Sequence, residues 1–408
     1  MNNNNNFKYK EISNLTKKHI DKTEIFDMHT HLFPPEHKSF YLIGLKNVLN
    51  YHYLIAELLT STDVEIKEFN LLTENEKASL IWSELFQKRS PVSEACQGVL
   101  TILKKFSITI ANKDYYTIDK ELKDKRYTDQ DIFSQSNVKS VVMTNNPFDK
   151  KEWSLFDKNN WDRNKYLSSL RLDNLFFDFE NSLKIAIEHT SNYEDKNNTI
   201  IKYLESCYHK ANPVYAAVSL NGKDFDNLLN DDLWLKILNW LESKNLPLSL
   251  MLGVKRGVNK NFGLAGDGVG EIDLKDLSKL CNLYQENKFL VTALPLNCQY
   301  ELTVLARKHP NLKIFGFWWF MNQPSIIEFI LKMRIDLLGL SFISQHSDAR
   351  IIDQLIYKWS HFKEILQKVL SDYYIKLSEK NFEVTENLIK RDISNLLKNN
   401  VKKFLGLK

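Results

Sequence analysis

Short runs of apolar and β-branched residues recur along the chain, and longer stretches with helical periodicity separate most of them. Short, nearly continuous apolar runs are typical of strands that are buried on both faces of a parallel sheet. We predict eight strands, at residues 25–29, 140–143, 167–172, 214–220, 246–252, 289–294, 312–317 and 337–342. The same periodicity criterion predicts helices between the later strands, at residues 228–243, 274–287, 301–309 and 325–334.

This alternation predicts an α/β fold, a parallel (β/α)8 TIM barrel with helices outside, and an open doubly wound sheet is the main alternative. More than 100 residues separate the first two strands, which exceeds the needs of one crossover helix. Amphipathic stretches in this interval predict a helical insertion after strand one, at about 45–135, with helices at 45–60, 74–86, 92–106 and 115–124. We also expect a low-complexity polar N-terminus at 1–20, a barrel domain over 21–408 and C-terminal helices at about 353–405.

Composition and charge narrow the function classes without selecting one. The chain has 408 residues, of which 43% are hydrophobic and 26% charged, and it carries a formal net charge of +4. Because the lysines are scattered among acidic residues, we expect no nucleic-acid partner and no membrane surface. No apolar run reaches the roughly 18 residues of a membrane span, and we expect a cytoplasmic protein. The four cysteines form no CxxC pair and are expected to be buried thiols.

The main chemical signal is the sequence Asp27-Met28-His29-Thr30-His31 at the end of the first predicted strand. Residues two apart on a strand point to the same face, so His29 and His31 can hold one metal ion together. Asp348 follows the last predicted strand, and it could complete the metal sphere or act as a base. Arg350, two residues further on, could bind an anionic group with two hydrogen bonds.

Other polar residues follow other predicted strands, and in a parallel barrel these strand ends form the active-site face. Arg171 ends strand three and Arg256 follows strand five, so three arginines at separate strand ends suggest a carboxylate or phosphate substrate. Asn145 would offer a neutral hydrogen-bonding group, and Trp318 a flat platform for a sugar. The segment 266–270 is glycine-rich but lacks a GKS or GKT ending, and we interpret it as a loop over the barrel mouth.

These residues, in this order, resemble the uronate isomerase (glucuronate isomerase) family of the amidohydrolase superfamily. The resemblance spans nearly the whole chain and rests on the segments DMHTHL (27–32), NYHYLIAE (50–57), NNPFD (145–149), RLD (171–173), WWF (318–320) and SDAR (347–350). It implies a distorted (β/α)8 barrel of the metal-dependent hydrolase type with a helical insertion after strand one. It also implies one divalent metal on His29, His31 and Asp348, for which zinc is the best-suited ion and manganese, iron and cobalt are alternatives.

The implied reaction interconverts D-glucuronate and D-fructuronate, or D-galacturonate and D-tagaturonate, through an enediol. We expect Asp348 to exchange protons with substrate hydroxyls, and Tyr53 to carry the carbon-acid proton transfer. Arg350 would stabilise the enediolate charge. Substrate-binding residues would be Arg171, Arg256, Trp318, Asn145 and His52. The substrate would be a small uronate sugar, and the resemblance implies a homo-oligomer.

Two departures from the family pattern keep alternatives open. Strands five and six end without the additional histidines that many amidohydrolases carry, which disfavours a binuclear hydrolase. Asn146 stands where we would expect an acid, so one hydrogen-bonding function is altered. The alternatives are a mononuclear metal-dependent hydrolase of a lactone or amide, and a non-catalytic barrel used for binding or assembly.

Overall fold

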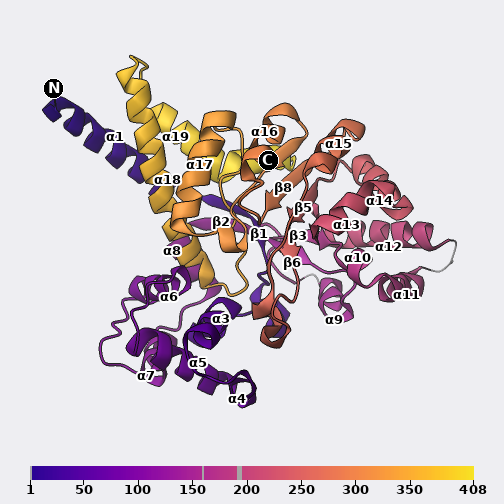
Figure 1. Ribbon diagram of the computed structural model, residues 1–408, viewed down its shortest axis with the longest axis horizontal. Coiled ribbons are helices and arrows are strands. Elements are labelled where there is room, and N and C mark those ends of the chain that lie inside the picture. Colours follow the sequence, from indigo (N-terminus) through magenta and orange to yellow (C-terminus); the bar gives the residue numbers. More distant parts are fainter. Residues whose placement is uncertain (1, 159, 191–194) are drawn as a thin grey trace.

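A curled parallel sheet lies at the centre of the computed structural model, which describes residues 2–158, 160–190 and 195–408 (Figure 1). All neighbouring strands in it are parallel, and they follow one another around the sheet in chain order. Each coincides with one of the first seven runs predicted from the sequence. The strands are β1 (Ile25–Thr30), β2 (Val138–Asn145), β3 (Tyr166–Arg171), β4 (Ala216–Leu220), β5 (Leu248–Leu252), β8 (Phe289–Ala293) and β9 (Leu312–Ile314).

The prediction of an eighth strand at 337–342 is wrong for the described part of the chain. Helix α17 (Pro324–Leu338) continues into this run and ends at Gly339, whose φ is +60°. The side-chain amide of Asn400 then donates hydrogen bonds to two carbonyl oxygens that a strand would have offered to its neighbours, those of Leu340 and Phe342. The last regular strand of the sheet is therefore β9.

An irregular segment, residues 343–349, fills the position of the missing strand. On one side it makes a single parallel bridge between Ile343 and Phe315, next to β9. On the other side it bonds to the end of β1, because the Asp348 N–H donates to the His29 carbonyl and the His31 N–H donates to the Ala349 carbonyl. These bonds connect the two edges of the curled sheet and confirm the barrel-type α/β fold.

Helices pack outside the sheet between consecutive strands, as the periodicity predicts. Their apolar faces cover the strands and leave polar faces to solvent. These helices are α9 (Lys150–Trp153), α10 (Asn174–Phe177), α11 (Phe179–His189), α12 (Lys196–Ala211), α13 (Gly222–Asn227), α14 (Asp232–Ser243), α15 (Lys275–Leu283), α16 (Gln299–Lys308) and α17. An antiparallel pair, β6 (Val254–Lys255) with β7 (Gly268–Val269), projects from the end of β5. The loop expected at 266–270 belongs to this pair.

The interval between β1 and β2 forms a helical lobe beside the sheet, at the lower left of Figure 1. It confirms that the long first interval is an insertion of helices. The lobe consists of α2 (Leu45–Leu49), α3 (His52–Ser61), α4 (Ile66–Leu71), α5 (Glu74–Trp82), α6 (Glu94–Lys105), α7 (Tyr115–Asp124) and α8 (Asp129–Ser136). The stretch predicted as one helix at 45–60 is two helices, because the chain leaves helical geometry at Asn50 and Tyr51.

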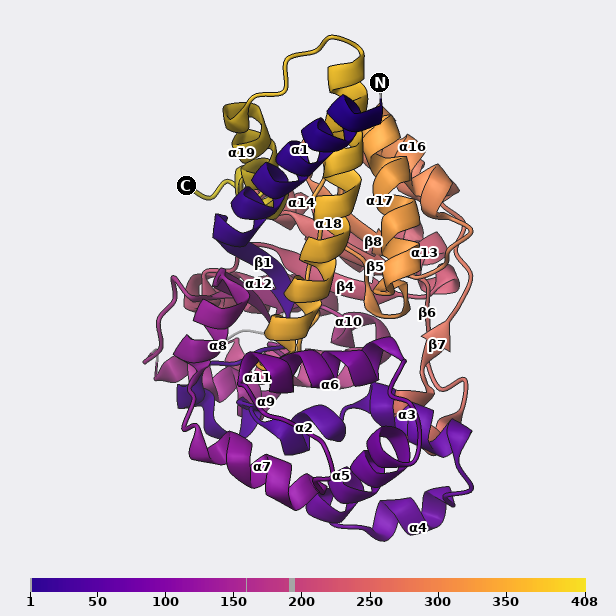
Figure 2. The ribbon, with the colours of Figure 1, turned by 90° about the vertical axis from the view of Figure 1, so that its left-hand side faces the viewer.

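Both ends of the described chain are helical. The long helix α18 (Gln354–Glu379) lies against α1 (Asn2–Lys22), and α1 also contacts α19 (Glu386–Ser394), as Figure 2 shows. The expected polar N-terminus is thus part of α1, which buries Ile12 and Ile20. The short helix α20 (Asn400–Phe404) packs Val401 into the apolar cluster that also contains Phe26, Met28 and Tyr215. None of the described helices combines the length and apolarity that a bilayer crossing needs.

Candidate active site

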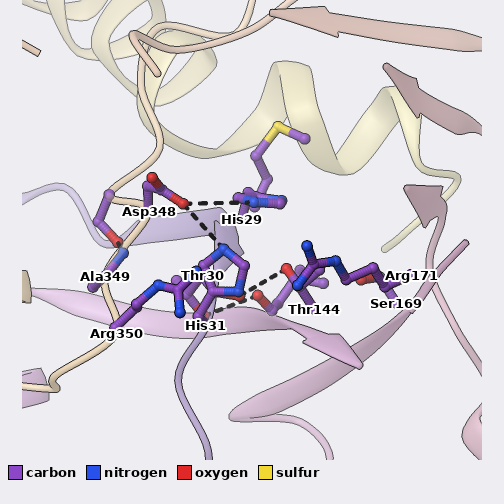
Figure 3. Close-up of polar contacts among 12 residues, drawn as sticks. His29, Thr30, His31, Thr144, Ser169, Arg171, Asp348, Ala349 and Arg350 are labelled. Atoms are coloured by element: carbon purple, nitrogen blue, oxygen red, sulfur yellow. Dashed lines mark hydrogen bonds and ion pairs between the residues drawn. The ribbon is translucent and has the colours of Figure 1, made fainter. Parts of the chain in front are cut away.

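His29, His31 and Asp348 meet at the end of β1, where the sequence predicts a metal site (Figure 3). Oδ1 of Asp348 lies 3.7 Å from Nε2 of His29 and 3.4 Å from Nε2 of His31. One ligand atom from each residue lies within 4.8 Å of the others. Nε2 of His29 and Oδ1 of Asp348 are buried and have no hydrogen-bond partner in the described structure. Two imidazoles and a carboxylate, with unpartnered donor atoms turned toward one another, fit a divalent cation.

The surroundings of these three residues favour the protonation states in which they can bind a metal ion. Burial lowers the pKa of His29 to about 3 and that of His31 to about 4, so both imidazoles are neutral at neutral pH. Burial acts to raise the pKa of Asp348, but the His31 and His29 rings, 3.4 and 3.7 Å away, and the Lys358 ammonium outweigh burial and hold that pKa well below its ordinary value. Neutral imidazoles and an ionised carboxylate are the forms that bind metals.

Asp348 owes its position to backbone contacts on both sides. Its φ is +52°, in the left-handed region that side chains other than glycine rarely adopt. The Asp348 N–H donates to the His29 carbonyl at 3.1 Å, and the preceding Ser347 N–H donates to Oδ1 of Asp27 at 3.1 Å. A strained conformation of this kind persists only where surrounding contacts impose it, and such residues cluster at functional sites.

Tyr215, which sequence analysis did not select, contacts His29 from inside the barrel. It directly precedes β4, is fully buried, and donates a 2.8 Å hydrogen bond to the Met28 carbonyl. The same hydroxyl lies 3.1 Å from Nδ1 of His29. Tyr215 is the second residue of the apolar run predicted at 214–220, where a tyrosine looks like an ordinary core residue, so the sequence carries no signal for this contact.

A cavity opens in front of the three candidate ligands. The predicted arginines Arg171, Arg256 and Arg350 all line it. Nε of Arg171 bonds to Asp173 at 2.8 Å, and Nη1 of Arg256 bonds to Asp267 at 2.7 Å. Arg350 makes no ion pair with any described carboxylate, so its guanidinium is available to an anionic ligand.

Aromatic and neutral polar groups complete the cavity wall. The predicted residues Trp318 and His52 line it, together with Trp319 and Thr144. Met251 lies at the end of β5, where many amidohydrolases would place a further histidine. The wall therefore combines aromatic rings with three arginines, two of which are paired with aspartates, and has the candidate metal-ligand group on one side.

Two predicted site residues lie outside this cavity wall. Tyr53 lines a neighbouring cavity, and Tyr51, which precedes α3, lines the central one. The Tyr53 hydroxyl is buried without a hydrogen-bond partner, and the two tyrosine rings are 4.9 Å apart. Asn145 is fully buried, and its amide donates a 3.1 Å hydrogen bond to Oε1 of Glu152.

Asn146, the departure from the family pattern, closes a turn. Its Oδ1 accepts from the Phe148 N–H, and its amide donates to Asn174. The buried acid in this region is Glu152, whose Oε1 also accepts the Asn146 N–H at 3.0 Å. Burial raises the pKa of Glu152 to about 7, against the opposing effect of its hydrogen bonds with Asn145 and Asn146.

Comparison with known proteins agrees with this geometry. No protein-family model and no curated protein matches the chain. Among solved structures, the uronate isomerase of Bacillus halodurans C-125 is 38% identical, with a TM-score of 0.91 over 98% of this chain and 97% of that one. The uronate isomerase of Thermotoga maritima (14% identity, TM-score 0.78, 97% of each chain) and the glucuronate isomerase of Caulobacter crescentus (14%, 0.75, 98% and 94%) share the fold.

A helix-wrapped parallel barrel with a His-x-His pair on its first strand and an aspartate after its last one defines an amidohydrolase-type enzyme with a candidate metal site. The 38% identity over nearly the full chain makes the assignment more specific. The chain belongs to the uronate isomerase family, and it is an aldose–ketose isomerase.

Proposed function

We propose that this isomerase interconverts D-glucuronate and D-fructuronate, or D-galacturonate and D-tagaturonate, in the cavity in front of His29, His31 and Asp348. The observation that carries the proposal is the pairing of unpartnered metal-ligand atoms with three arginines on one cavity wall. The oxygens of a sugar acid can bind a metal ion at the ligand atoms, and its carboxylate can bind the arginines.

We propose a single divalent ion, zinc, held by His29, His31 and Asp348. Two nitrogens and one carboxylate oxygen suit zinc and leave coordination positions for substrate oxygens. When bound, the ion would stabilise negative charge on the substrate oxygens at C1 and C2.

The residues around this site would bind and orient the substrate. Arg350, which has no carboxylate partner among the described residues, would bind the uronate carboxylate or the enediolate with two hydrogen bonds, and Arg171 and Arg256 would assist it. The flat faces of Trp318 and Trp319 would support the sugar carbons, and His52 would bond to a hydroxyl. Asn145 would act indirectly, by fixing the end of β2.

Proton transfer requires one group that accepts and one that donates. Asp348 is ionised and can take a proton from a substrate hydroxyl during ring opening. Burial raises the pKa of Tyr51 and that of Tyr53 above the ordinary tyrosine value, so both phenols are protonated and can donate. Because Tyr51 lines the cavity, we assign to it the carbon-acid proton transfer that Tyr53 was expected to perform: Asp348 takes the proton from C2, the Tyr51 phenol gives its proton to C1, and return of the proton from Asp348 to the Tyr51 oxygen restores both groups.

The deciding experiment incubates the purified protein with D-glucuronate and with D-galacturonate, each with added zinc or manganese, and measures ketose formation. We expect turnover of at least one uronate, and loss of more than about 100-fold in rate for His31→Ala. His209→Ala, a change at an exposed histidine on α12, is the matched control. A metal-loaded protein that converts neither sugar would contradict the proposal and favour the hydrolase or the non-catalytic alternative. The homo-oligomer and the cytoplasmic location stay predictions.

A further inference from the structure

The hydroxyl of Tyr215 lies between two groups of β1, the Met28 carbonyl and the His29 ring. Its oxygen is 2.8 Å from the Met28 oxygen and 3.1 Å from Nδ1 of His29. The tyrosine is fully buried, and its ring lies 6.5 Å from the His29 ring at an interplanar angle of 23°. No step in the proposed reaction uses this residue.

The single proton of the Tyr215 hydroxyl sets the direction of both hydrogen bonds. A tyrosine hydroxyl has one hydrogen to donate, and a carbonyl oxygen can only accept. Two oxygens approach to 2.8 Å only with a hydrogen between them, so the Tyr215 hydroxyl donates to the Met28 carbonyl. The Tyr215 oxygen can then only accept from Nδ1–H of His29.

This direction determines which nitrogen of His29 is free. A neutral imidazole has one protonated nitrogen and one with a lone pair. With the proton on Nδ1, the lone pair is on Nε2, which is the buried, unpartnered atom 3.7 Å from Oδ1 of Asp348. The reverse arrangement would place a proton where a metal has to bind.

We propose that Tyr215 is a positioning residue of the metal site: its hydroxyl holds the proton of His29 on Nδ1 and so presents Nε2 to the ion before the ion arrives. The inference rests on the proposed metal site but not on the identity of the sugar. Partners of this kind orient a ligating histidine, and their loss typically weakens metal binding by about 10- to 100-fold.

The test variant is Tyr215→Phe, which removes only the hydroxyl. Zinc affinity of the metal-free protein is measured by competition with a chromogenic chelator, and we expect it to fall by about 10- to 100-fold. Tyr203→Phe is the matched control, because it deletes another buried tyrosine hydroxyl, bonded to the Pro147 carbonyl away from the site. The control should lower thermal stability and leave zinc affinity unchanged.

A second measurement needs no variant. Nitrogen-15 NMR of histidine-labelled, metal-free wild-type protein reports which nitrogen of His29 carries the proton. We expect the Nδ1–H form, and a predominant Nε2–H form would overturn the inference. Equal zinc affinities of Tyr215→Phe and wild type would overturn it as well. Failure to turn over a uronate would instead contradict the proposed function and leave the tautomer result intact.

Discussion

Nε1 of Trp359 donates a 2.9 Å hydrogen bond to Oδ2 of Asp27, which joins α18 to the strand that carries both candidate histidine ligands. The other oxygen of Asp27 accepts the Ser347 N–H. One buried carboxylate therefore connects β1, the segment that carries Asp348, and the long C-terminal helix. The candidate ligands come from opposite ends of the chain, and the hydrogen bonds of Asp27 hold together the segments that carry them.

This contact predicts a measurable coupling between Asp27 and Trp359. In a double-mutant cycle of Asp27→Ala and Trp359→Phe, we expect a coupling free energy of about 1.5–3 kcal/mol, the usual value for a hydrogen bond to a charged group. Urea unfolding of the metal-free proteins measures it. Because the cycle subtracts the effect of each single substitution, the packing lost in Trp359→Phe does not enter the coupling free energy. Two single effects that add within about 0.5 kcal/mol would contradict the prediction.

The two tyrosines of the 51–53 segment should differ in their effect on catalysis. We expect Tyr51→Phe to lower kcat by about 100-fold or more, since general acid catalysis contributes about that much, and Tyr53→Phe to change it by less than about 10-fold. The measurement is the exchange of the substrate C2 proton with deuterated solvent, with zinc content checked in both variants. A larger loss for Tyr53→Phe would restore the assignment made from the sequence.

Arg350 should contribute more to uronate binding than Arg256. The Arg350 guanidinium is the one on the cavity wall that has no described carboxylate partner. Arg350→Lys removes its ability to bind a carboxylate through two hydrogen bonds, and we expect KM to rise by about 10- to 100-fold. Arg256→Lys should have a smaller effect, because that guanidinium is bonded to Asp267 and is partly exposed. Steady-state kinetics of both variants, with the exposed Arg391→Lys as control, test the order.

Glu152 should make stability depend on pH. Burial raises its pKa from 4.5 to about 7 in the folded protein, so its protonated form stabilises the fold fully below pH 4.5 and this contribution is lost as pH rises through 7. At about 1.4 kcal/mol per pH unit, the loss is on the order of 3 kcal/mol. Glu152→Gln should lack this loss and gain stability relative to wild type between pH 5 and 8, as measured by urea unfolding. A difference that stays constant over this range would exclude Glu152 as the titrating group.

Gly316 should tolerate no side chain. Its φ is +54°, and a Cβ atom there would lie 1.9 Å from Nδ1 of His346, a buried ring that packs against His29. We expect Gly316→Ala to destabilise the fold by more than about 3 kcal/mol and to weaken zinc binding. Gly339→Ala is the matched control, because its φ is +60° but nothing lies within 4 Å of the added atom. The control should cost only the backbone strain, on the order of 1–3 kcal/mol.

The sequence by itself determined the seven strands of the sheet and the candidate metal-ligand group. Apolar runs with the right spacing predict parallel strands, and strand ends meet at one face of a barrel, so His29, His31 and Asp348 could be brought together without coordinates. The eighth strand could not be predicted correctly, because the Asn400 amide that occupies its carbonyl oxygens lies about 60 residues further along the chain.

Only the tertiary structure decided which residues surround the candidate metal ligands. Tyr51 has extended geometry just before helix α3, which starts at His52, and it lies on the cavity wall, whereas Tyr53, in the first turn of the helix, lies beside the neighbouring cavity. The hydrogen bond between Nδ1 of His29 and the Tyr215 hydroxyl joins residues 186 positions apart and leaves no local pattern. Periodicity records which face of an element is buried, but the partner of a single polar atom depends on distances that only the folded chain sets.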